Sequence, residues 1–379
     1  MTCRCQQTSV ALFVRFFVMW IEQMDMSMKE NRFTLRAMQP SDSPELGKLI
    51  TTFDGDMTTQ FEVNAYEAIL FGTENHTAGV VVEAAGHDGL VGLGTVRFSQ
   101  VQFNNEILPL AFLDGLKVHP DFRKQGLGYQ IASWRVQQAI DTYGERCVIA
   151  TGLLRSNDAS RATARKWCRE FIDVAFQPVI QTRRSRQPRS TQGIQIRELA
   201  PNEYAQFALK QNRYYQTYNL FPPASAETIA HALDVTVADK KPYRFYAAFD
   251  AGGDMLAGTQ VWCRGLLKND IFSNPPPPLR ILNPLLHILP PDFILRDAAV
   301  AGLWHEAGQS QAAQFLWEWL RWELRDAATN IFLAIDPRDP LRAVTGRPPF
   351  FMPKIEITIA LRGPTPIERD KLVFGYGRV

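Results

Sequence analysis

"VHPDFRKQGLG", residues 118–128, stands between two segments with different patterns. Before it, "ILPLAFLDGLKV" (107–118) is rich in Leu, Ile, Val and Phe, as β-strands are, and Pro120 bars a smooth continuation of that strand. After it, apolar residues recur at helical spacing as far as Gly144. The pattern predicts a strand, a tight turn and then a helix.

This turn has the composition of an anion-binding site. The first N–H groups of a helix have no intrahelical acceptor, and together with the helix dipole they attract negative charge. Gly126 and Gly128 let a phosphate approach the backbone, while Arg123 and Lys124 add positive charge. This composition suits a pyrophosphate. The turn is neither a Walker A loop nor a GxGxxG motif, so a dinucleotide-binding fold is not supported. The alternative is an ordinary strand-to-helix turn with solvated charges.

Length and composition narrow the class of protein. A chain of 379 residues is long enough for two domains, and 46% apolar with 21% charged residues is typical of a folded protein. A net charge of +2 argues against a dedicated nucleic-acid partner. The five cysteines form no CxxC pair, so we expect neither a disulfide framework nor a bound metal.

The first residues form a separate segment. "VALFVRFFVMWI" (10–21) is apolar but too short to span a membrane, and no A-x-A cleavage site follows it. We therefore expect no membrane association and a cytoplasmic location. Residues 1–30 are interpreted as an N-terminal extension, disordered or upstream of a natural start at Met24, Met26 or Met28.

The two halves of the chain repeat one plan. "NRFTLRAMQPSDSPELGKLI" (31–50) and "IQIRELAPNEYAQFALKQN" (194–212) each predict a strand, an arginine, a Pro-marked turn and a helix. A hairpin follows in each half, at 78–98 in the first and at 243–263 in the second. A long strand and a long helix come next, at 109–141 and at about 293–325. Further strands are predicted at 147–154, 330–336 and 354–361. We interpret this as a tandem duplication with a period of about 165 residues.

A basic segment separates the two repeats. "QTRRSRQPRSTQG" (181–193) contains four arginines and few apolar residues, as solvated linkers do. A nucleic-acid or membrane patch is the alternative, but no aromatic residues are interleaved with the charges. We therefore divide the chain into domains at 31–180 and 194–379, joined by this linker.

The motif "LKVHPDFRKQGLG" (116–128) resembles the acetyl-CoA-binding signature of the GNAT (Gcn5-related N-acetyltransferase) superfamily. The matching positions are Val118, His119, Pro120, Arg123, Gly126 and Gly128. The resemblance implies an α/β (α+β) fold of two tandem GNAT-like domains, each a mixed, mostly antiparallel sheet flanked by helices. It also implies an N-acetyltransferase in which a primary amine attacks acetyl-CoA directly.

The resemblance also assigns a cofactor site. Backbone groups near Leu116 and Val118 are expected to pair with the pantetheine arm as an added strand does. The turn is expected to hold the pyrophosphate through Arg123, Lys124, Gln125, Gly126, Leu127, Gly128 and Tyr129. Asn157 and Ser160, which follow the next strand, are further expected cofactor contacts.

Asp114 is the candidate general base. Strand alternation predicts that its side chain shares a face with Leu116 and Val118, and an exposed strand-start acid is the alternative. We assign His119 to the turn. The tyrosine that many superfamily members use as the acid has no counterpart in "ARKWCREFIDV" (164–174), so the acid is unassigned.

The second half departs from the signature. In "GLWHEAGQSQAA" (302–313), Ala307, Ser310 and Ala312 align with Arg123, Gly126 and Gly128. We expect this degenerate domain to have lost its cofactor and to shape the acceptor site or a homodimer contact. The alternative for the whole chain is a non-catalytic acyl-CoA-binding or protein-interaction module. The sequence does not identify the acceptor amine.

Overall fold

The structure is a computed structural model, and it describes most of the chain. The described residues are 32–52, 57–70, 77–182, 186–189, 193–275, 277–286, 289–346 and 354–375. The predicted extension at 1–30 lies outside the described residues, as does part of the predicted linker at 181–193. Within the described ranges no helix is both long and apolar enough to cross a membrane.

The first half follows the predicted order of strands and helices. Its elements are β1 (Phe33–Ala37), η1 (Pro40–Asp42), α2 (Ser43–Thr51), β2 (Met57–Phe61), α3 (Ala65–Leu70), β3 (Thr77–Ala84), β4 (Leu90–Phe103), β5 (Glu106–Val118), η2 (Pro120–Phe122), α4 (Leu127–Tyr143), β6 (Val148–Leu154), α5 (Asp158–Ala164) and β7 (Glu170–Gln181). The predicted hairpin is the antiparallel pair β3–β4. Helix α4 ends at Tyr143, and the capping residue Gly144 has a φ of 74°, which is favourable only for glycine.

The second half repeats this order with one insertion. Its elements are β8 (Gln195–Glu198), η3 (Pro201–Glu203), α6 (Tyr204–Tyr214), α7 (Ala226–Asp234), β9 (Tyr243–Phe249), β10 (Met255–Trp262), η4 (Arg264–Leu266), β11 (Lys268–Phe272), α8 (Pro277–Leu286), β12 (Ile294–Leu295), β13 (Asp297–His305), α9 (Ser310–Glu323), η5 (Leu324–Asp326), β14 (Asn330–Phe332), α10 (Leu341–Thr345) and β15 (Lys354–Arg362). The inserted arm is β11–α8–β12. Strand β14 is shorter than predicted, since it ends at Phe332.

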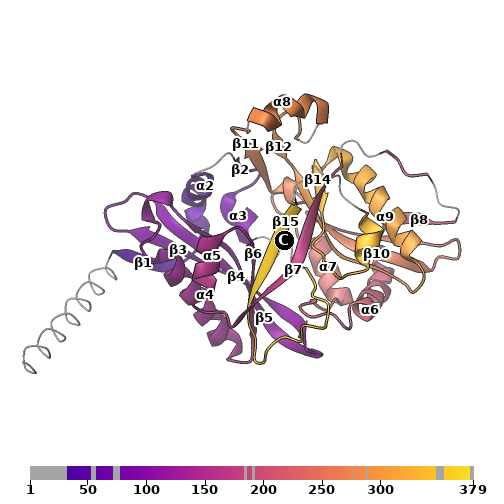
Figure 1. Ribbon diagram of the computed structural model, residues 1–379, viewed down its shortest axis with the longest axis horizontal. Helices are drawn as coiled ribbons and strands as arrows, with labels where there is room; N and C mark the ends of the chain where they lie inside the picture. The colour runs from indigo at the N-terminus through magenta and orange to yellow at the C-terminus, as the bar shows by residue number, and fades with distance from the viewer. Residues whose placement is uncertain are drawn as a thin grey trace, which may run out of the picture.

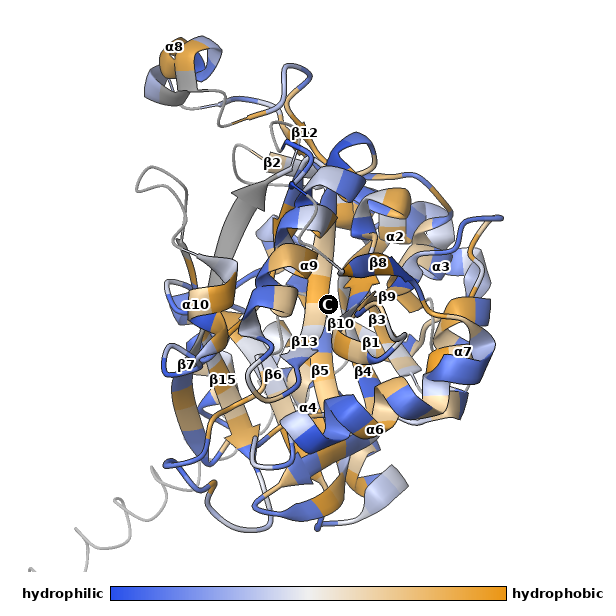
Figure 2. Cartoon of the chain, turned by 90° about the vertical axis from the view of Figure 1, so that its right-hand side faces the viewer, coloured by the Kyte–Doolittle hydropathy of each residue, from blue (hydrophilic) through white to orange (hydrophobic). Residues whose placement is uncertain are grey.

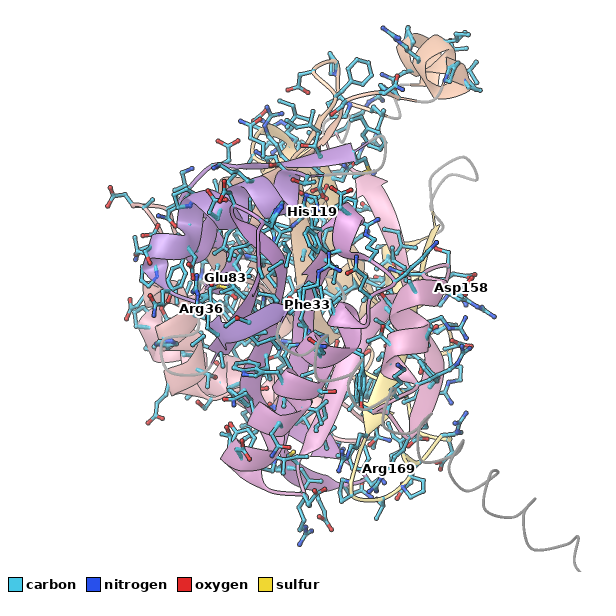
Figure 3. The ribbon with its side chains drawn as sticks, turned by 90° about the vertical axis from the view of Figure 1, so that its left-hand side faces the viewer. Phe33, Arg36, Glu83, His119, Asp158 and Arg169 are labelled. Atoms are coloured by element: carbon cyan, nitrogen blue, oxygen red, sulfur yellow. The ribbon has the colours of Figure 1, made fainter. Side chains whose placement is uncertain are left out.

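The Arg–Pro–acid pattern encodes the same local structure in both halves. Arg36 donates two hydrogen bonds to Asp42, at 2.8 and 2.7 Å, and Arg197 donates two to Glu203, at 2.7 and 2.5 Å. These hydrogen bonds hold the pKa of both carboxyl groups below their ordinary values. Arg36 also pairs with Glu83 of β3, beside it in Figure 3.

The two halves share one twelve-stranded sheet, in which one strand of each half pairs with a strand of the other half. The strand order is β1-β3-β4-β5-β6-β15-β7-β14-β13-β10-β9-β8. Strand β15, the last of the chain, pairs with β6 of the first half, and β7 of the first half pairs with β14 of the second. In Figure 1, β7 and β15 lie side by side at the centre of the molecule. The two predicted domains therefore do not have separate sheets.

Helices cover both faces of this sheet. In the first half, α4 packs on β4 and β5, and α2 packs on β4 from the opposite face. In the second half, α9 and α6 both pack on β10 and β13. A smaller three-stranded sheet, β12-β11-β2, joins β2 of the first half to the inserted arm of the second.

Helix α8 stands away from the body at the tip of this arm (Figure 2). The sequence predicts a stiff loop at 274–278, but the helix begins at Pro277, because proline is favourable in the first turn of a helix. Ile281 and Leu285 of this helix are each 76% exposed.

The strand exchange makes a prediction about folding. Ile359, at the centre of β15, is fully buried, so Ile359→Ala should lower the free energy of unfolding by about 2–5 kcal/mol. Because β15 belongs to both halves of the sheet, a urea titration followed by circular dichroism should show one unfolding transition. In the variant this whole transition should shift to lower urea concentration. Ile107→Ala, at a 52% exposed position, is the control. Two separate transitions, with only one of them shifted, would contradict this coupling.

Candidate functional site

Strands β5 and β6 diverge at the start of the candidate site. They pair in parallel only through residues 110–112 and 148–150, although β5 continues to Val118 and β6 to Leu154. The outer edges of both strands remain paired, with β4 and β15 respectively. Among the described strands, the inner edge of β5 therefore has no partner over residues 113–118.

A β-bulge marks the point of divergence. Leu93 pairs with Lys117 and Thr95 with Asp114, so β5 contains one extra residue relative to β4. Gly115 takes up the bulge with a φ of 62°. The carbonyl oxygen of Asp114 accepts hydrogen bonds from Thr95 Oγ1 at 3.1 Å and from Nη1 of the buried Arg135 at 2.9 Å. Both hydrogen bonds stabilise the bulge.

The bulge overturns the prediction that Asp114 shares a face with Leu116 and Val118. Those two side chains pack with Leu127 at the start of α4. The extra residue at Gly115 reverses the alternation, so the Asp114 side chain lies on the opposite face. There its carboxylate pairs with Arg97 at 3.2 Å and accepts the N–H of Gly115 at 2.7 Å.

Side chains of the predicted anion turn brace the turn itself. Nδ1 of His119 accepts the N–H of Asp121 at 3.3 Å, consistent with the turn role assigned to it (Figure 3). Arg123 Nε donates to the carbonyl oxygen of Val118 at 3.2 Å, and Gln125 Nε2 donates to that of Asp121 at 3.0 Å. These bonds hold the main chain of the turn in place before the helix begins.

The main chain of the turn presents a run of N–H groups. Lys124 and Gly126 have φ values of 61° and 83°, and alternation of this kind turns successive N–H groups toward one side. Tyr129 N–H donates to the carbonyl oxygen of Gly126 at 3.0 Å. Within the described part of the chain, the N–H groups of residues 124–128 have no hydrogen-bond acceptor.

The two glycines of the turn differ in what they permit. Gly126 needs its left-handed conformation, and a Cβ placed on it would meet open space. A Cβ on Gly128 would make ordinary contact with Thr163 of α5, at 3.7 Å, so packing does not require glycine there. The free volume lies above Gly126.

The remaining predicted residues lie around this turn. Leu127 is buried in the core, and the ring of Tyr129 lies beneath Lys166 Nζ at 4.5 Å. Asn157 caps α5, because its Oδ1 accepts the N–H of Ser160 at 3.0 Å. The structure thus places the predicted cofactor residues on β5, the turn, the start of α4 and the start of α5.

The second half contains an equivalent divergence and bulge. Strands β13 and β14 pair in parallel only through residues 297–299 and 330–332. The bulge falls at Gly302, with a φ of 58°, and Thr259 Oγ1 donates to the carbonyl oxygen of Ala301 at 2.9 Å. Gly302 therefore occupies the position of Gly115, whereas Gln260, which pairs with Ala301, has the register position of Thr95, and Thr259 lies one residue before it.

The turn that follows differs between the halves, and the predicted alignment of the two turns is wrong. The turn spans residues 119–126 in the first half but only 306–309 in the second. Because α9 begins at Ser310, that residue corresponds to Leu127 and not to Gly126. Glu306, just before α9, is paired with Lys210 at 2.7 Å.

Aromatic side chains and the C-terminal segment pack beside β13. Tyr215 donates its hydroxyl to the carbonyl oxygen of Leu303, the counterpart of Leu116, at 2.5 Å. Phe374 packs against the Tyr215 ring, with centroids 5.2 Å apart, and its N–H donates to the carbonyl oxygen of Asn219. A strand-like ligand would have to displace these groups.

Sequence reasoning missed a basic residue at Asp114. Arg97 of β4 pairs with the Asp114 carboxylate at 3.2 Å. No local sequence signal connects these two residues, because they lie on neighbouring strands, 17 positions apart.

Comparison with solved structures identifies the fold. N-myristoyltransferase from Saccharomyces cerevisiae, solved with bound myristoyl-CoA, superposes with a TM-score of 0.60 at 10% identity, over 90% of this chain and 86% of that one. A GCN5-related N-acetyltransferase from Sphaerobacter thermophilus gives 0.52 at 14% identity, over 87% and 94%. One from Kribbella flavida gives 0.50 at 13% identity, over 86% and 70%.

These likenesses confirm the predicted fold, an α/β structure of two tandem GNAT-like units. They extend over both halves of the chain. No protein-family model matches the chain, and no curated protein resembles it in sequence.

A buried acid in the second half yields a pH-dependent stability. Burial raises the pKa of Asp339 to about 6, although it accepts hydrogen bonds from Leu341 N–H and the Tyr218 hydroxyl. The folded protein therefore keeps this proton between about pH 4 and 6, where the unfolded chain loses it, so stability should rise as the pH falls through this window. Asp339→Asn should stabilise the protein at pH 7 by on the order of 2 kcal/mol and remove this rise.

Urea titrations at pH 5 and pH 7 measure this effect, with the exposed Asp370→Asn as the control. Equal stabilisation of the Asp339 variant at both values would show that the carboxyl group does not change its charge on unfolding.

Proposed function

We propose that this chain is an acyltransferase that uses acyl-CoA as donor and a primary amine as acceptor. The observation that carries the proposal is the run of N–H groups at 124–128, without protein acceptors among the described residues, beside the unpaired edge of β5. The fold supports it, since structures that share it include an N-myristoyltransferase with myristoyl-CoA and N-acetyltransferases.

In this proposal the coenzyme lies along the β5 edge. Its pyrophosphate binds the N–H groups of 124–128 and the start of α4, where the helix dipole and Lys124 add attraction. The pantetheine arm then follows residues 113–118 as an added strand would. The thioester reaches the bulge at Gly115, next to Asp114.

The reaction proposed is direct attack of the amine on the thioester. We propose acetyl-CoA as the donor, and Asp114 as the candidate general base because its carboxylate lies at the bulge. No step requires a metal ion, and the described residues contain no cluster of three or more His, Cys, Asp or Glu that could hold one. A cytoplasmic location and a homodimer stay predictions.

A non-catalytic acyl-CoA-binding module is the second candidate. It is favoured by the segment 164–174, which lacks the tyrosine that would protonate the leaving thiolate. Cys168 in that segment is not suited to act as a nucleophile, because burial raises the pKa of its thiol.

The coenzyme site is tested by filling the space above Gly126. Gly126→Trp should abolish binding of coenzyme A in calorimetric titrations, because the indole occupies the pyrophosphate position. Gly253→Trp is the control, since Gly253 lies in the second half with a similar φ, of 87°, and equally open surroundings. If both variants bind coenzyme A as the wild type does, the pyrophosphate site is not at this turn.

Catalysis is tested by thiol release from acetyl-CoA, with myristoyl-CoA in parallel, in the presence of a panel of primary amines. Amine-dependent release supports the transferase, and binding of either donor without release supports the module. A faster reaction with myristoyl-CoA would show that the acyl group is long.

Asp114 is tested by substitution. Asp114→Asn should lower the rate of thiol release and shift its pH profile, because a negative charge at the bulge is lost. Asp121→Asn, in the exposed part of the turn, is the control. A rate and profile like those of the wild type would remove Asp114 from the mechanism.

A further inference from the structure

A buried arginine lies directly behind the bulge of β5. Arg135 of α4 is only 4% exposed, and its Nη1 donates to the carbonyl oxygens of Asp114 at 2.9 Å and Thr95 at 3.3 Å. A Cβ placed on Gly94 of β4 would come within 3.1 Å of Arg135 Cδ and 3.2 Å of its Nε. The arginine side chain therefore lies against the main chain of β4, and Gly94 leaves the room for it.

The charge of Arg135 is not balanced by a carboxylate. Among the described residues, no carboxylate lies within ion-pair distance of its guanidinium, and its buried Nε has no hydrogen-bond acceptor. The carboxylate of Asp114 is paired instead with Arg97 of β4, at 3.2 Å. Two guanidinium groups and one carboxylate leave one unbalanced positive charge at the bulge. Burial makes this charge unfavourable and lowers the pKa of Arg135 to about 10, so the group is still charged at pH 7.

The second half forms an equivalent bulge without an arginine behind it. Ala301 has the register position of Asp114, and the neutral side chain of Gln211 donates to the carbonyl oxygen of Gly302 at 3.1 Å. The buried residues of α9 are all apolar, whereas those of α4 include Arg135. A bulge of this kind therefore does not require a buried cation. The unbalanced charge belongs to the half that also has the anion turn.

The proposed acyl transfer creates one negative charge at this place. In that proposal the thioester of the donor reaches the bulge at Gly115, next to Asp114. Attack by the amine moves the C=O electron pair of the thioester onto its oxygen, and a charge of opposite sign that is already fixed nearby stabilises this oxyanion. The thioester of the bound donor has no such charge, so a buried cation favours the transition state over the bound donor.

We propose that Arg135 is a positioning residue that holds the peptide group between Asp114 and Gly115 and stabilises the thioester oxyanion with its charge from behind the bulge. The proposal rests on the acyl transfer proposed above, and Asp114 keeps its role as general base. The amine nitrogen forms a bond to the thioester carbon and gives its proton to Asp114. The oxyanion then restores the C=O bond, and the C–S bond breaks with its electron pair on sulfur. The thiolate takes a proton from water, and Asp114 returns its own to water.

The first test compares two substitutions that separate charge from hydrogen bonding. Arg135→Gln retains a neutral donor, as Gln211 is in the second half, and Arg135→Lys retains the charge. With acetyl-CoA and an amine that the wild type accepts, Arg135→Gln should lower kcat by about 100-fold and leave the KM for acetyl-CoA within about threefold. The kcat of Arg135→Lys should stay within about tenfold of the wild type. Arg146→Gln, at an exposed position after α4, is the matched control.

The second test measures the effect of the charge on the thioester without turnover. Acetyl-CoA labelled with carbon-13 at its thioester carbonyl is bound in the absence of amine, and the C=O stretching band is recorded by isotope-edited infrared difference spectroscopy. A nearby cation draws electrons toward the carbonyl oxygen and weakens the C=O bond, so the band of the bound donor should lie at lower frequency than that of the free donor. Arg135→Lys should retain most of this shift, and Arg135→Gln should lose most of it.

Several outcomes would overturn the proposal. Equal losses of kcat in both variants, or a wild-type rate in Arg135→Gln, would show that the charge is not the property that matters. Folded variants that no longer bind coenzyme A would give Arg135 a structural role only. A wild-type band at the frequency of the free donor would also reject the proposal, and this measurement decides the question even if neither variant folds. A wild type that binds no coenzyme A, or releases no thiol with any amine, would instead reject the acyltransferase itself.

Discussion

The parallel pairing of β5 with β6 ends after three residues, and the rest of the site depends on that interruption. A bulge at Gly115 turns β5 away at this point, and it is held by hydrogen bonds from Thr95 and Arg135 to one carbonyl oxygen. β6 cannot close the gap, because its other edge is paired with β15 along most of its length. The result is a strand edge inside the molecule that is open to a ligand but protected from pairing with another protein.

The same frame occurs twice, and only the turn after it distinguishes the halves. Gly115 and Gly302 hold equivalent bulges, and in each half a threonine of the neighbouring strand donates to the carbonyl oxygen of the residue before the glycine. The longer first turn exposes main-chain N–H groups, whereas the shorter second turn places Glu306 beside the start of its helix. Because Lys210 is paired with this carboxylate, the ion pair adds no net positive charge that would attract a phosphate. The bulged strand and the helix that follows it thus hold the turn in the same position in both halves, and the residues of the turn determine which ligand can bind.

The exchange of β7 and β15 explains why the second half matters to the first. Each half depends on a strand of the other for its sheet, so neither can move independently. The inserted arm of the second half adds a second connection, because its strand β11 pairs with β2 of the first half.

Local pattern alone determined much of this protein. Apolar periodicity, the glycines and the prolines located β5, the turn and α4, and the repeated arginine and acid located the paired turns, because these features depend on neighbours within a few residues. Only the tertiary structure decided the orientation of Asp114, since a single extra residue at Gly115 reverses the strand alternation. It alone also decided the place of β15 beside β6, because contacts between residues far apart in the sequence depend on sheet order, which no local pattern encodes.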